Sequence, residues 1–259
     1  MRPPADPSRI GAAAPTAQIR ALAALTRYLS HDFLGGPRLL RLSWVINFQK
    51  LGTAPFVVLL MLGYRNTSAA AWVYLALHGS YGVCWVLKDL AFPDRRWQER
   101  VTFGGALMSV VLVLGLYWVA PWLLIAGVLG PDHGQPATAL LAGAIARHTV
   151  GLAIMIGADA QKHFTLHARP GLITDGLFSR TRHPNYLGEM MIYASYALIV
   201  RHWIPWAILA WVWGAVFYPN MRMIEASIAR YPGYAAWRRR TGLVLPSVWR
   251  ARRSAKGEG

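Results

Sequence analysis

Six long apolar runs constrain this chain more than any other feature of its sequence. They cover residues 41–63, 69–91, 103–127, 138–157, 185–200 and 203–219. A membrane-spanning helix needs about 20 mostly apolar residues, and a chain that is 55% hydrophobic and only 15% charged is typical of a membrane protein. The last two runs are short and lie on either side of Arg201 and His202, which predicts a tight helical hairpin. We therefore expect an all-α polytopic membrane bundle of about six transmembrane helices.

The two ends of the chain differ in composition from these runs. Residues 1–15 are rich in Ala and Pro, which predicts disorder. Apolar side chains then recur at helical spacing over 17–34, which predicts an amphipathic helix on the membrane surface. The sequence thus divides into a disordered start with a surface helix (1–40), a single integral-membrane catalytic domain (41–246) and a basic flexible tail (247–259).

The basic residues alternate between connections. Of the 27 Lys and Arg residues, 23 lie in the two terminal segments and in the connections on the same predicted side, whereas the opposite connections carry only Arg65 and Arg201. This bias follows the positive-inside rule and predicts that both termini are cytoplasmic. It also accounts for the net charge of +16 without a nucleic-acid partner. We expect contacts with membrane lipids, and the sequence implies no protein partner.

The stretch 176–189 carries the densest polar chemistry in the chain. Pro184 is suited to the first turn of a helix, where the missing N–H costs nothing. Arg180 and Arg182 would then flank a helix N-terminus, an arrangement that binds phosphate or carboxylate groups. Glu189 follows about one turn inside the fifth apolar run. A carboxylate at membrane depth is costly without a partner, so Glu189 is a candidate functional residue.

Three other apolar runs place polar side chains at similar depth. Lys50 with Gln49, Tyr81, and the pair Arg147 and His148 each lie about 10–15 Å from the predicted cytoplasmic edge. Each has an ordinary structural interpretation: a snorkelling lysine, a hydrogen-bonded core tyrosine, or an arginine that binds a lipid headgroup. Together they indicate a cavity that opens towards the cytoplasm.

The sequence predicts neither a nucleotide-binding site of the kind found in soluble folds nor a metal site. The predicted cytoplasmic loop 158–184 contributes polar residues, among them Asp159, Lys162 and Arg169. The sequence lacks the G-x-G-x-x-G and Walker patterns of soluble nucleotide-binding folds. No cluster of His, Cys, Asp and Glu has metal-ligand spacing, so we expect no metal.

From about Asp159 to Pro246 the chain resembles the C-terminal half of the steroid 5α-reductase-like membrane proteins. The matching pieces are Asp159-Ala-Gln-Lys162, Gly176-Leu-Phe178, Arg182-His-Pro-Asn-Tyr-Leu-Gly-Glu189, Arg230-Tyr-Pro-Gly-Tyr234 and the segment from Thr241 to Pro246. The same superfamily includes sterol C14-reductases and the isoprenylcysteine and phosphatidylethanolamine methyltransferases. The Asn-x-x-Gly-Glu pattern from Asn185 to Glu189 is similar to that of the reductase branch.

The resemblance implies an NADPH-dependent oxidoreductase that reduces a C=C bond conjugated to a carbonyl in a lipid- or steroid-like substrate. Gln49 and Tyr81 resemble the glutamine and tyrosine that face the substrate enone, and Lys50 stands where those reductases have a glutamate. Tyr81, aided by Lys50, is the expected donor to the carbonyl oxygen. The residues expected to contact the cofactor are Asp159, Lys162, Arg169, Arg180, Arg182, His183, Asn185, Tyr186, Glu189 and Glu225.

Two other hypotheses remain open at the level of the sequence. The first is an S-adenosylmethionine-dependent methyltransferase acting on a lipid or a prenylated substrate, with His183, Tyr186 and Glu225 facing the cofactor. The second is a non-catalytic membrane protein that keeps the fold to bind a lipid or sterol. Identification of a co-purified cofactor would separate the three.

Overall fold

The structure, a computed structural model, describes residues 15–130 and 134–247. The predicted disordered start and basic tail therefore lie almost wholly outside the described residues. Besides two strands, the described elements are helical. In chain order they are α1 (Ala17–His31), β1 (Leu40–Arg41), α2 (Leu42–Gly63), α3 (Ala69–Ala91), β2 (Arg100–Val101), α4 (Phe103–Ser109), the π-helical turn η2 (Val110–Leu114), the 3-10 turn η3 (Gly115–Trp118), α5 (Val119–Ile125), α6 (Thr138–Ala168), the 3-10 turn η5 (Gly176–Ser179), α7 (Pro184–Val200), α8 (Trp203–Val212), the π-helical turn η6 (Trp213–Phe217), α9 (Tyr218–Ile228) and α10 (Tyr234–Arg240).

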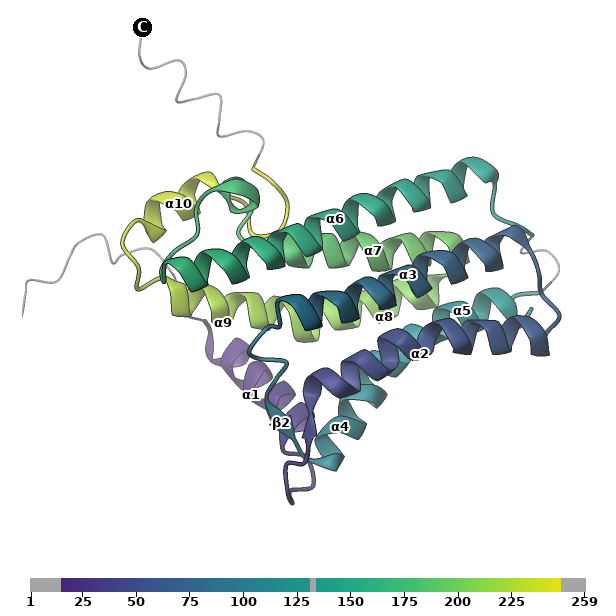
Figure 1. The fold of residues 1–259 in the computed structure, drawn as a ribbon, viewed down its shortest axis with the longest axis horizontal. Coiled ribbons are helices and arrows are strands. Elements are labelled where there is room, and N and C mark those ends of the chain that lie inside the picture. The colour runs from purple at the N-terminus through teal and green to yellow at the C-terminus, as the bar shows by residue number, and fades with distance from the viewer. Residues whose placement is uncertain (1–14, 131–133, 248–259) are drawn as a thin grey trace, which may run out of the picture.

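The long helices run roughly alongside one another in one bundle (Figure 1). Among the described residues, four helical segments are long and apolar enough to cross a membrane: Leu42–Gly63, Ala69–Ala91, Phe103–Ile125 and Thr138–Ala168. The third of these is the continuous rod from α4 to α5. The predicted all-α polytopic membrane class is confirmed. The fifth and sixth predicted spans correspond to the 17-residue α7 and to the rod from α8 to α9, which pack in the same bundle.

Two predicted boundaries are wrong. The sixth apolar run was expected to end at residue 219, yet the helical segment that begins with α8 continues through α9 to Ile228. The fourth apolar run was expected to end at residue 157, yet α6 continues to Ala168. Asp159 and Lys162 therefore lie on a helix rather than in a loop. Polar side chains such as these are compatible with a helix, and the helix stops only before Pro170, which disfavours helical backbone at Arg169.

The helix starts follow local sequence signals. The hydroxyl of Thr16 accepts a hydrogen bond from the amide of Ile19 at 3.3 Å, Ser68 caps α3 in the same way, and Thr102 caps α4. Pro184 occupies the first turn of α7 as its sequence position predicts. The α7–α8 hairpin turns at Arg201, whose φ of 53° is left-handed. These caps fix where each helix enters the bundle.

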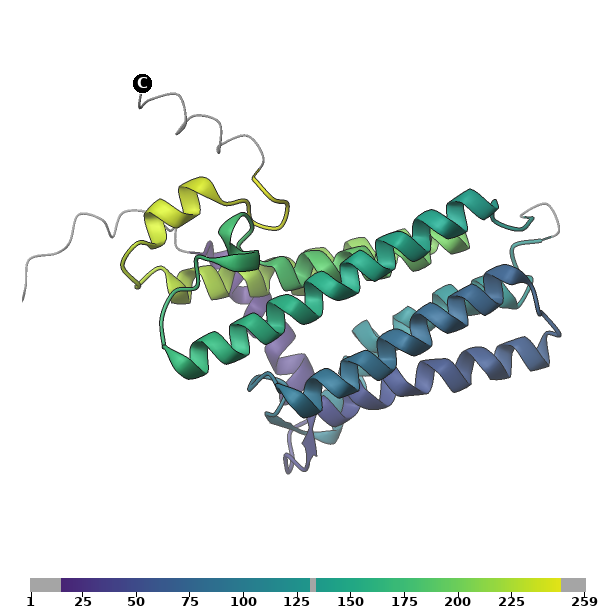
Figure 2. The ribbon, with the colours of Figure 1, turned by 45° about the horizontal axis from the view of Figure 1, so that its top comes forward.

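Helices α6 and α7 pack closely along their length (Figure 2). Their backbones meet at Gly151 and Gly188: a Cβ on Gly188 would lie 2.6 Å from the amide nitrogen of Met155, and one on Gly151 would lie 2.8 Å from the carbonyl oxygen of Gly188. No side chain fits between the helices at this level. The contact holds the start of α7, and with it the stretch 176–189, against α6.

We expect Gly188→Ala to lower the free energy of unfolding by about 1–3 kcal/mol, because the added methyl group must push two helix backbones apart. Gly143→Ala on the neighbouring helix α6 is the control, since a Cβ there meets nothing within 4 Å. The control should be neutral or stabilise the protein by up to about 1 kcal/mol. Denaturant titration in detergent micelles measures both. Equal stabilities of the two variants would contradict the close-packing argument.

The C-terminal segment closes one end of the bundle over the stretch 176–189. The indole N–H of Trp237 in α10 donates to the carbonyl of Phe178 at 2.9 Å. The backbone amides of Arg182 and His183 donate to the carbonyls of Gly242 and Leu243 at 2.9 and 3.1 Å. The segment 234–247 is therefore bonded to the residues that lead into α7.

Candidate active site

Lys50 lies at the centre of a buried polar cluster between α2, α3 and α7. Only 2% of the residue is exposed. Its ammonium group donates to the hydroxyl of Tyr81 at 3.1 Å and to the hydroxyl of Tyr193. The rings of Trp85 and Tyr117 lie 4.9 and 5.6 Å from the same nitrogen. Phenol oxygens and aromatic faces thus compensate the charge of a lysine that water does not reach.

A close approach of two helices creates this contact. A Cβ on Gly82 would collide with the carbonyl oxygen of Lys50, so only glycine allows α3 to lie so near α2. Gly82 directly follows Tyr81, and the close approach brings the Tyr81 hydroxyl to the ammonium of Lys50. The sequence predicted that these two residues share a depth in the membrane, and the structure brings them together.

Glu189 joins the cluster from α7. The hydroxyl of Tyr81 donates to its carboxylate at 3.5 Å, and Lys50 interacts with it electrostatically. Tyr81 therefore lies between a cation and an anion that come from different halves of the chain. Hydrogen bonds in such a buried setting are stronger than in water.

Gln49 does not join this cluster. Its side-chain amide donates to the hydroxyl of Thr53 at 3.4 Å, and the same hydroxyl accepts from the indole of Trp118 at 2.8 Å. The amide oxygen of Gln49 is buried and has no hydrogen-bond partner. Consecutive helix residues point about 100° apart, so Gln49 and Lys50 face different neighbours. The unpartnered oxygen leaves Gln49 able to accept a hydrogen bond from a ligand.

A second buried network lies beside the first. His78 stacks on Tyr196 with ring centroids 4.3 Å apart, and its Nδ1 lies 3.2 Å from the hydroxyl of Tyr74. His148 Nε2 lies 3.1 Å from the hydroxyl of Tyr196. His78 Nε2 is buried without a partner. Tyr193 packs edge-on against Tyr196 and connects this network to the Lys50 cluster.

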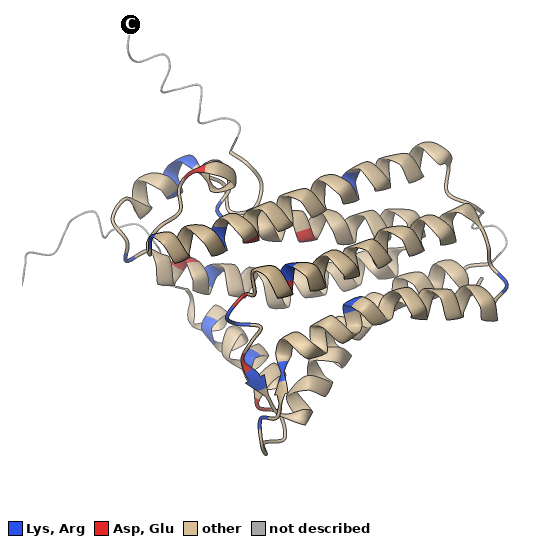
Figure 3. Cartoon of the chain, viewed as in Figure 1, with Lys and Arg blue, Asp and Glu red and all other residues tan. Residues whose placement is uncertain are grey.

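Charged residues gather at one end of the bundle, near α1, β2, α9 and α10 (Figure 3). Here Lys162 donates to Asp94 at 3.0 Å, and Arg96 lies 3.5 Å from the same carboxylate. Burial opposes the charge on Asp94, but Lys162 and Arg96 outweigh it and hold the pKa of this carboxyl well below its usual range. Lys88 and Asp159 form a further buried ion pair. Asp159 is therefore bonded within the protein rather than open to solvent.

Arg182 is placed differently from its sequence interpretation. Its guanidinium is buried, forms an ion pair with Glu225, and donates to the carbonyl of Thr241 at 2.6 Å. A buried guanidinium with these internal partners braces the C-terminal segment and does not face an open phosphate site. Glu225, which was also expected to contact the cofactor, forms this ion pair instead. Arg182 has these partners because α9 and the segment 241–247 pack against the residues that precede α7. Rules for helix starts do not describe such long-range contacts.

The other predicted anion-binding residues lie nearer the surface. Arg180 is exposed, and Arg169 forms an exposed ion pair with Asp175 at 3.1 Å. His183 precedes α7 and is 4% exposed, and its Nε2 has no hydrogen-bond partner. Burial, together with the charges of Arg182, Arg96 and Lys162, lowers the pKa of the His183 imidazole to about 3. This imidazole is therefore neutral at pH 7 and can accept or donate one hydrogen bond.

Asn185 and Tyr186 form the first turn of α7. Asn185 is half-buried, and Tyr186 is buried with its ring edge-on to that of Phe217 at 4.9 Å. The phenol of Tyr186 also interacts with Arg96. Arg96 thus touches both Asp94 and the start of α7, although its sequence position in a short connection gave it no expected role.

Tyr193 is a second functional candidate that was not assigned from the sequence. It lies one helical turn after Glu189, on the same face of α7. That spacing was visible in the sequence, but only the structure shows that its hydroxyl reaches Lys50. Among the described residues, no group of three or more His, Cys, Asp or Glu could hold a metal ion.

Comparison with known proteins identifies relatives without a stated activity. The family model described as "Protein of unknown function (DUF1295)" matches residues 38–252. The uncharacterized protein C7D4.09c of Schizosaccharomyces pombe is 40% identical over 53 residues, which are 20% of this chain and 18% of that protein. The uncharacterized protein C594.04c of the same yeast is 32% identical over 93 residues, or 34% of this chain and 27% of that protein. The matched segments are thus a minor part of both yeast proteins.

Proposed function

The chain belongs to the DUF1295 family, and we propose that it is a membrane-embedded, NADPH-dependent reductase of the steroid 5α-reductase-like type. The substrate would be a lipid- or steroid-like molecule with a C=C bond conjugated to a carbonyl. The observation that carries the proposal is the contact of Tyr81 with both Lys50 and Glu189. Tyr81, which is expected to contact the carbonyl group of the substrate, therefore lies next to Glu189, which is expected to contact the cofactor.

The chemistry of an enone explains why this cluster is suitable. Reduction at the β-carbon builds negative charge on the carbonyl oxygen, and a hydrogen-bond donor in a dry site stabilises that charge. Tyr81 is the donor, and the ammonium of Lys50 at 3.1 Å favours transfer of the phenolic proton. NADPH, when bound, supplies the hydride. Lys50 stands where the steroid enzymes have a glutamate, so the electrostatic potential at the Tyr81 hydroxyl is more positive next to α2.

The residues near the start of α7 fit a nucleotide. His183 offers a buried, unpartnered ring nitrogen, and Arg96 and Lys162 supply positive charge beside it. Arg180 is exposed at the same loop. These groups would bind phosphates, while Asn185 and Glu189 would orient the nicotinamide-ribose end. Arg182 is left out of this assignment because its guanidinium is buried against Glu225, whereas the side chain of Lys162, which shares the carboxylate of Asp94 with Arg96, is 33% exposed.

The proposed orientation in the membrane agrees with a cytoplasmic cofactor. The C-terminal end of α6, the start of α7 and the connection 92–99 lie at the charge-rich end of the bundle, whereas the connection between α2 and α3, which contains Arg65, lies at the opposite end (Figures 1 and 3). The positive-inside rule assigns the charge-rich end to the cytoplasm. Both described ends of the chain, α1 and α10, lie at that end as well (Figure 1).

Titration of the purified, detergent-solubilised protein with NADPH and with S-adenosylmethionine tests the proposal. We expect NADPH binding, and we expect Lys162→Gln to weaken it about tenfold or more, because a charge-assisted hydrogen bond is lost. Arg65→Gln, at the far end of the bundle, is the matched control and should bind NADPH as the wild type does. A protein that binds S-adenosylmethionine and ignores NADPH would refute the reductase and favour the methyltransferase alternative.

A further inference from the structure

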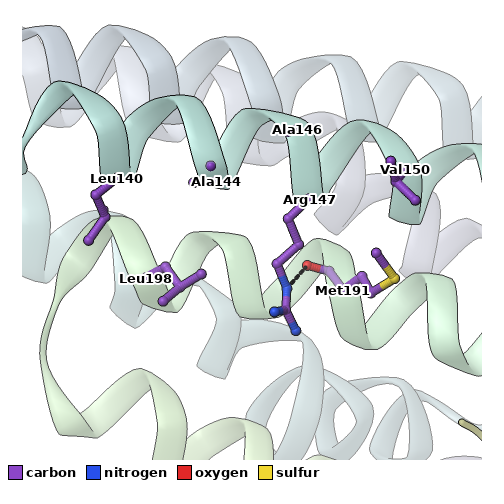
Figure 4. A pocket seen from close by; sticks show the side chains of 8 residues that line it. Leu140, Ala144, Ala146, Arg147, Val150, Met191 and Leu198 are labelled. Carbon is purple, nitrogen blue, oxygen red and sulfur yellow. Dashed lines mark hydrogen bonds between the residues drawn. The ribbon is translucent and has the colours of Figure 1, made fainter.

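A groove runs along α6 and α7 (Figure 4), and none of the residues that line it belongs to the Lys50 cluster. Its volume is about 480 Å³. The residues that line it are Leu140, Gly143, Ala144, Ala146, Arg147, Val150, Met191 and Leu198. All of them except Arg147 are apolar. They lie on a helix that is long and apolar enough to cross a membrane, paired with α7.

Small residues create the groove. Gly143, Ala144 and Ala146 leave the surface of α6 low between Leu140 and Val150. A Cβ on Gly143 would meet nothing within 4 Å, so the space is open rather than filled by a neighbouring side chain. The stretch from Leu140 to Val150 is about 15 Å long at the helical rise, which accommodates part of an extended hydrocarbon chain.

Arg147 is the single charge in this groove. Its Nε donates to the carbonyl of Met191 at 3.4 Å, which anchors the guanidinium across the two helices. Among the described residues, none of the ion pairs involves Arg147. The carbonyl leaves most of the guanidinium donors available and does not neutralise the charge. An exposed arginine about 14 Å along a membrane helix is costly unless an anion meets it.

The position of Arg147 also separates it from the proposed active site. His148, the next residue, points inward to Tyr196, whereas Arg147 is exposed on a different side of the helix. The expectation that Arg147 shares a central cavity with Lys50 and Tyr81 is therefore wrong. The cause is the 100° rotation between consecutive helix residues, which depth along the helix does not reveal.

We propose that this groove binds one anionic phospholipid of the surrounding bilayer. The phosphate meets the guanidinium of Arg147, for which planar bidentate contact is favourable, and an acyl chain lies against the apolar lining. Charge complementarity favours a lipid over an uncharged hydrocarbon, and the location on a membrane helix favours a lipid over a soluble anion. This inference does not depend on the reductase activity.

The test is native mass spectrometry of the full chain in mild detergent, titrated with phosphatidylglycerol and, separately, with zwitterionic phosphatidylcholine. The wild type should bind phosphatidylglycerol more tightly. Arg147→Gln should weaken phosphatidylglycerol binding by about tenfold or more and remove the preference, whereas Arg147→Lys should retain most of it. Gly143→Leu fills the groove and should weaken binding of both lipids. Elution on size-exclusion chromatography verifies that each variant is folded.

Two variants serve as matched controls. Arg65→Gln removes an exposed arginine elsewhere, and Gly214→Leu adds the same side chain at another exposed helical glycine with nothing within 4 Å. Both should bind lipid as the wild type does. Unchanged phosphatidylglycerol binding in Arg147→Gln or in Gly143→Leu would overturn the proposal. Displacement of the lipid by inorganic phosphate at similar concentration would show a free-anion site instead. A dimer that Gly143→Leu dissociates would show that a second copy covers the groove.

Discussion

Replacing Tyr81 with phenylalanine is expected to lower the turnover of an enone by about 10²–10³-fold while the affinity for NADPH stays unchanged. The substitution removes only the hydroxyl that contacts Lys50 and Glu189. The nucleotide-phosphate residues proposed near the start of α7 are untouched, so binding and turnover should separate. Consumption of NADPH with a steroid 4-en-3-one as the probe measures turnover, and a fluorescence titration measures affinity.

Tyr74→Phe is the matched control for this experiment. Tyr74 lies on the same helix, is also fully buried, and contacts His78 rather than Lys50. Its loss should lower stability by about the 0.5–1.5 kcal/mol of one hydrogen bond and leave turnover near the wild-type value. If Tyr81→Phe and Tyr74→Phe reduced turnover equally, the hydroxyl of Tyr81 would not be the donor to the carbonyl oxygen.

Local sequence signals predicted much of this architecture. Apolar length identified the helices, and Pro184 identified the start of α7. The shared depth of Lys50 and Tyr81 could be read from residue spacing because both lie on helices of known rise. Their direct contact also depends on Gly82, which allows the two helices to approach. The fold class and the shared level of Lys50 and Tyr81 along neighbouring helices were therefore predictable, whereas the contact required knowledge of helix packing.

Long-range pairings were not predictable in the same way. Helix rotation decides whether neighbouring residues face the core or the membrane, as Arg147 and His148 illustrate. The partner of Arg182 lies 43 positions away, on α9, and no local pattern relates the two. Arg96 reaches Asp94 and Tyr186 from a short connection. Rules for helix starts treat flanking arginines as free to bind an anionic ligand. In the folded protein, Arg182 already binds the carboxylate of Glu225.

The pair of Arg182 and Glu225 gives the second large expected effect. Side chains of both residues are less than 10% exposed. Glu225→Leu alone should lower the free energy of unfolding by about 3–5 kcal/mol, because it leaves the buried guanidinium of Arg182 without its carboxylate partner. Arg182→Met alone should cost less, because Arg222 still lies 3.5 Å from the other oxygen of the Glu225 carboxylate. The double variant should recover much of that loss, since two apolar side chains of similar size can pack together. Arg169→Met is the control: its ion pair with Asp175 is exposed and should contribute at most about 1 kcal/mol.

Denaturant titration of the four variants and the wild type separates a structural brace from a ligand-binding residue. If Arg182 is the brace described here, the double variant regains stability without any nucleotide present. NADPH affinity per folded molecule should then be close to the wild-type value, because the remaining cations Arg96, Lys162 and Arg180 are unchanged. A double variant that is as stable as the wild type but has lost NADPH binding would instead return Arg182 to the cofactor site. Additive losses in the double variant would mean that the two charges do not compensate each other, and that the hydrogen bond from Arg182 to Thr241 carries the stability.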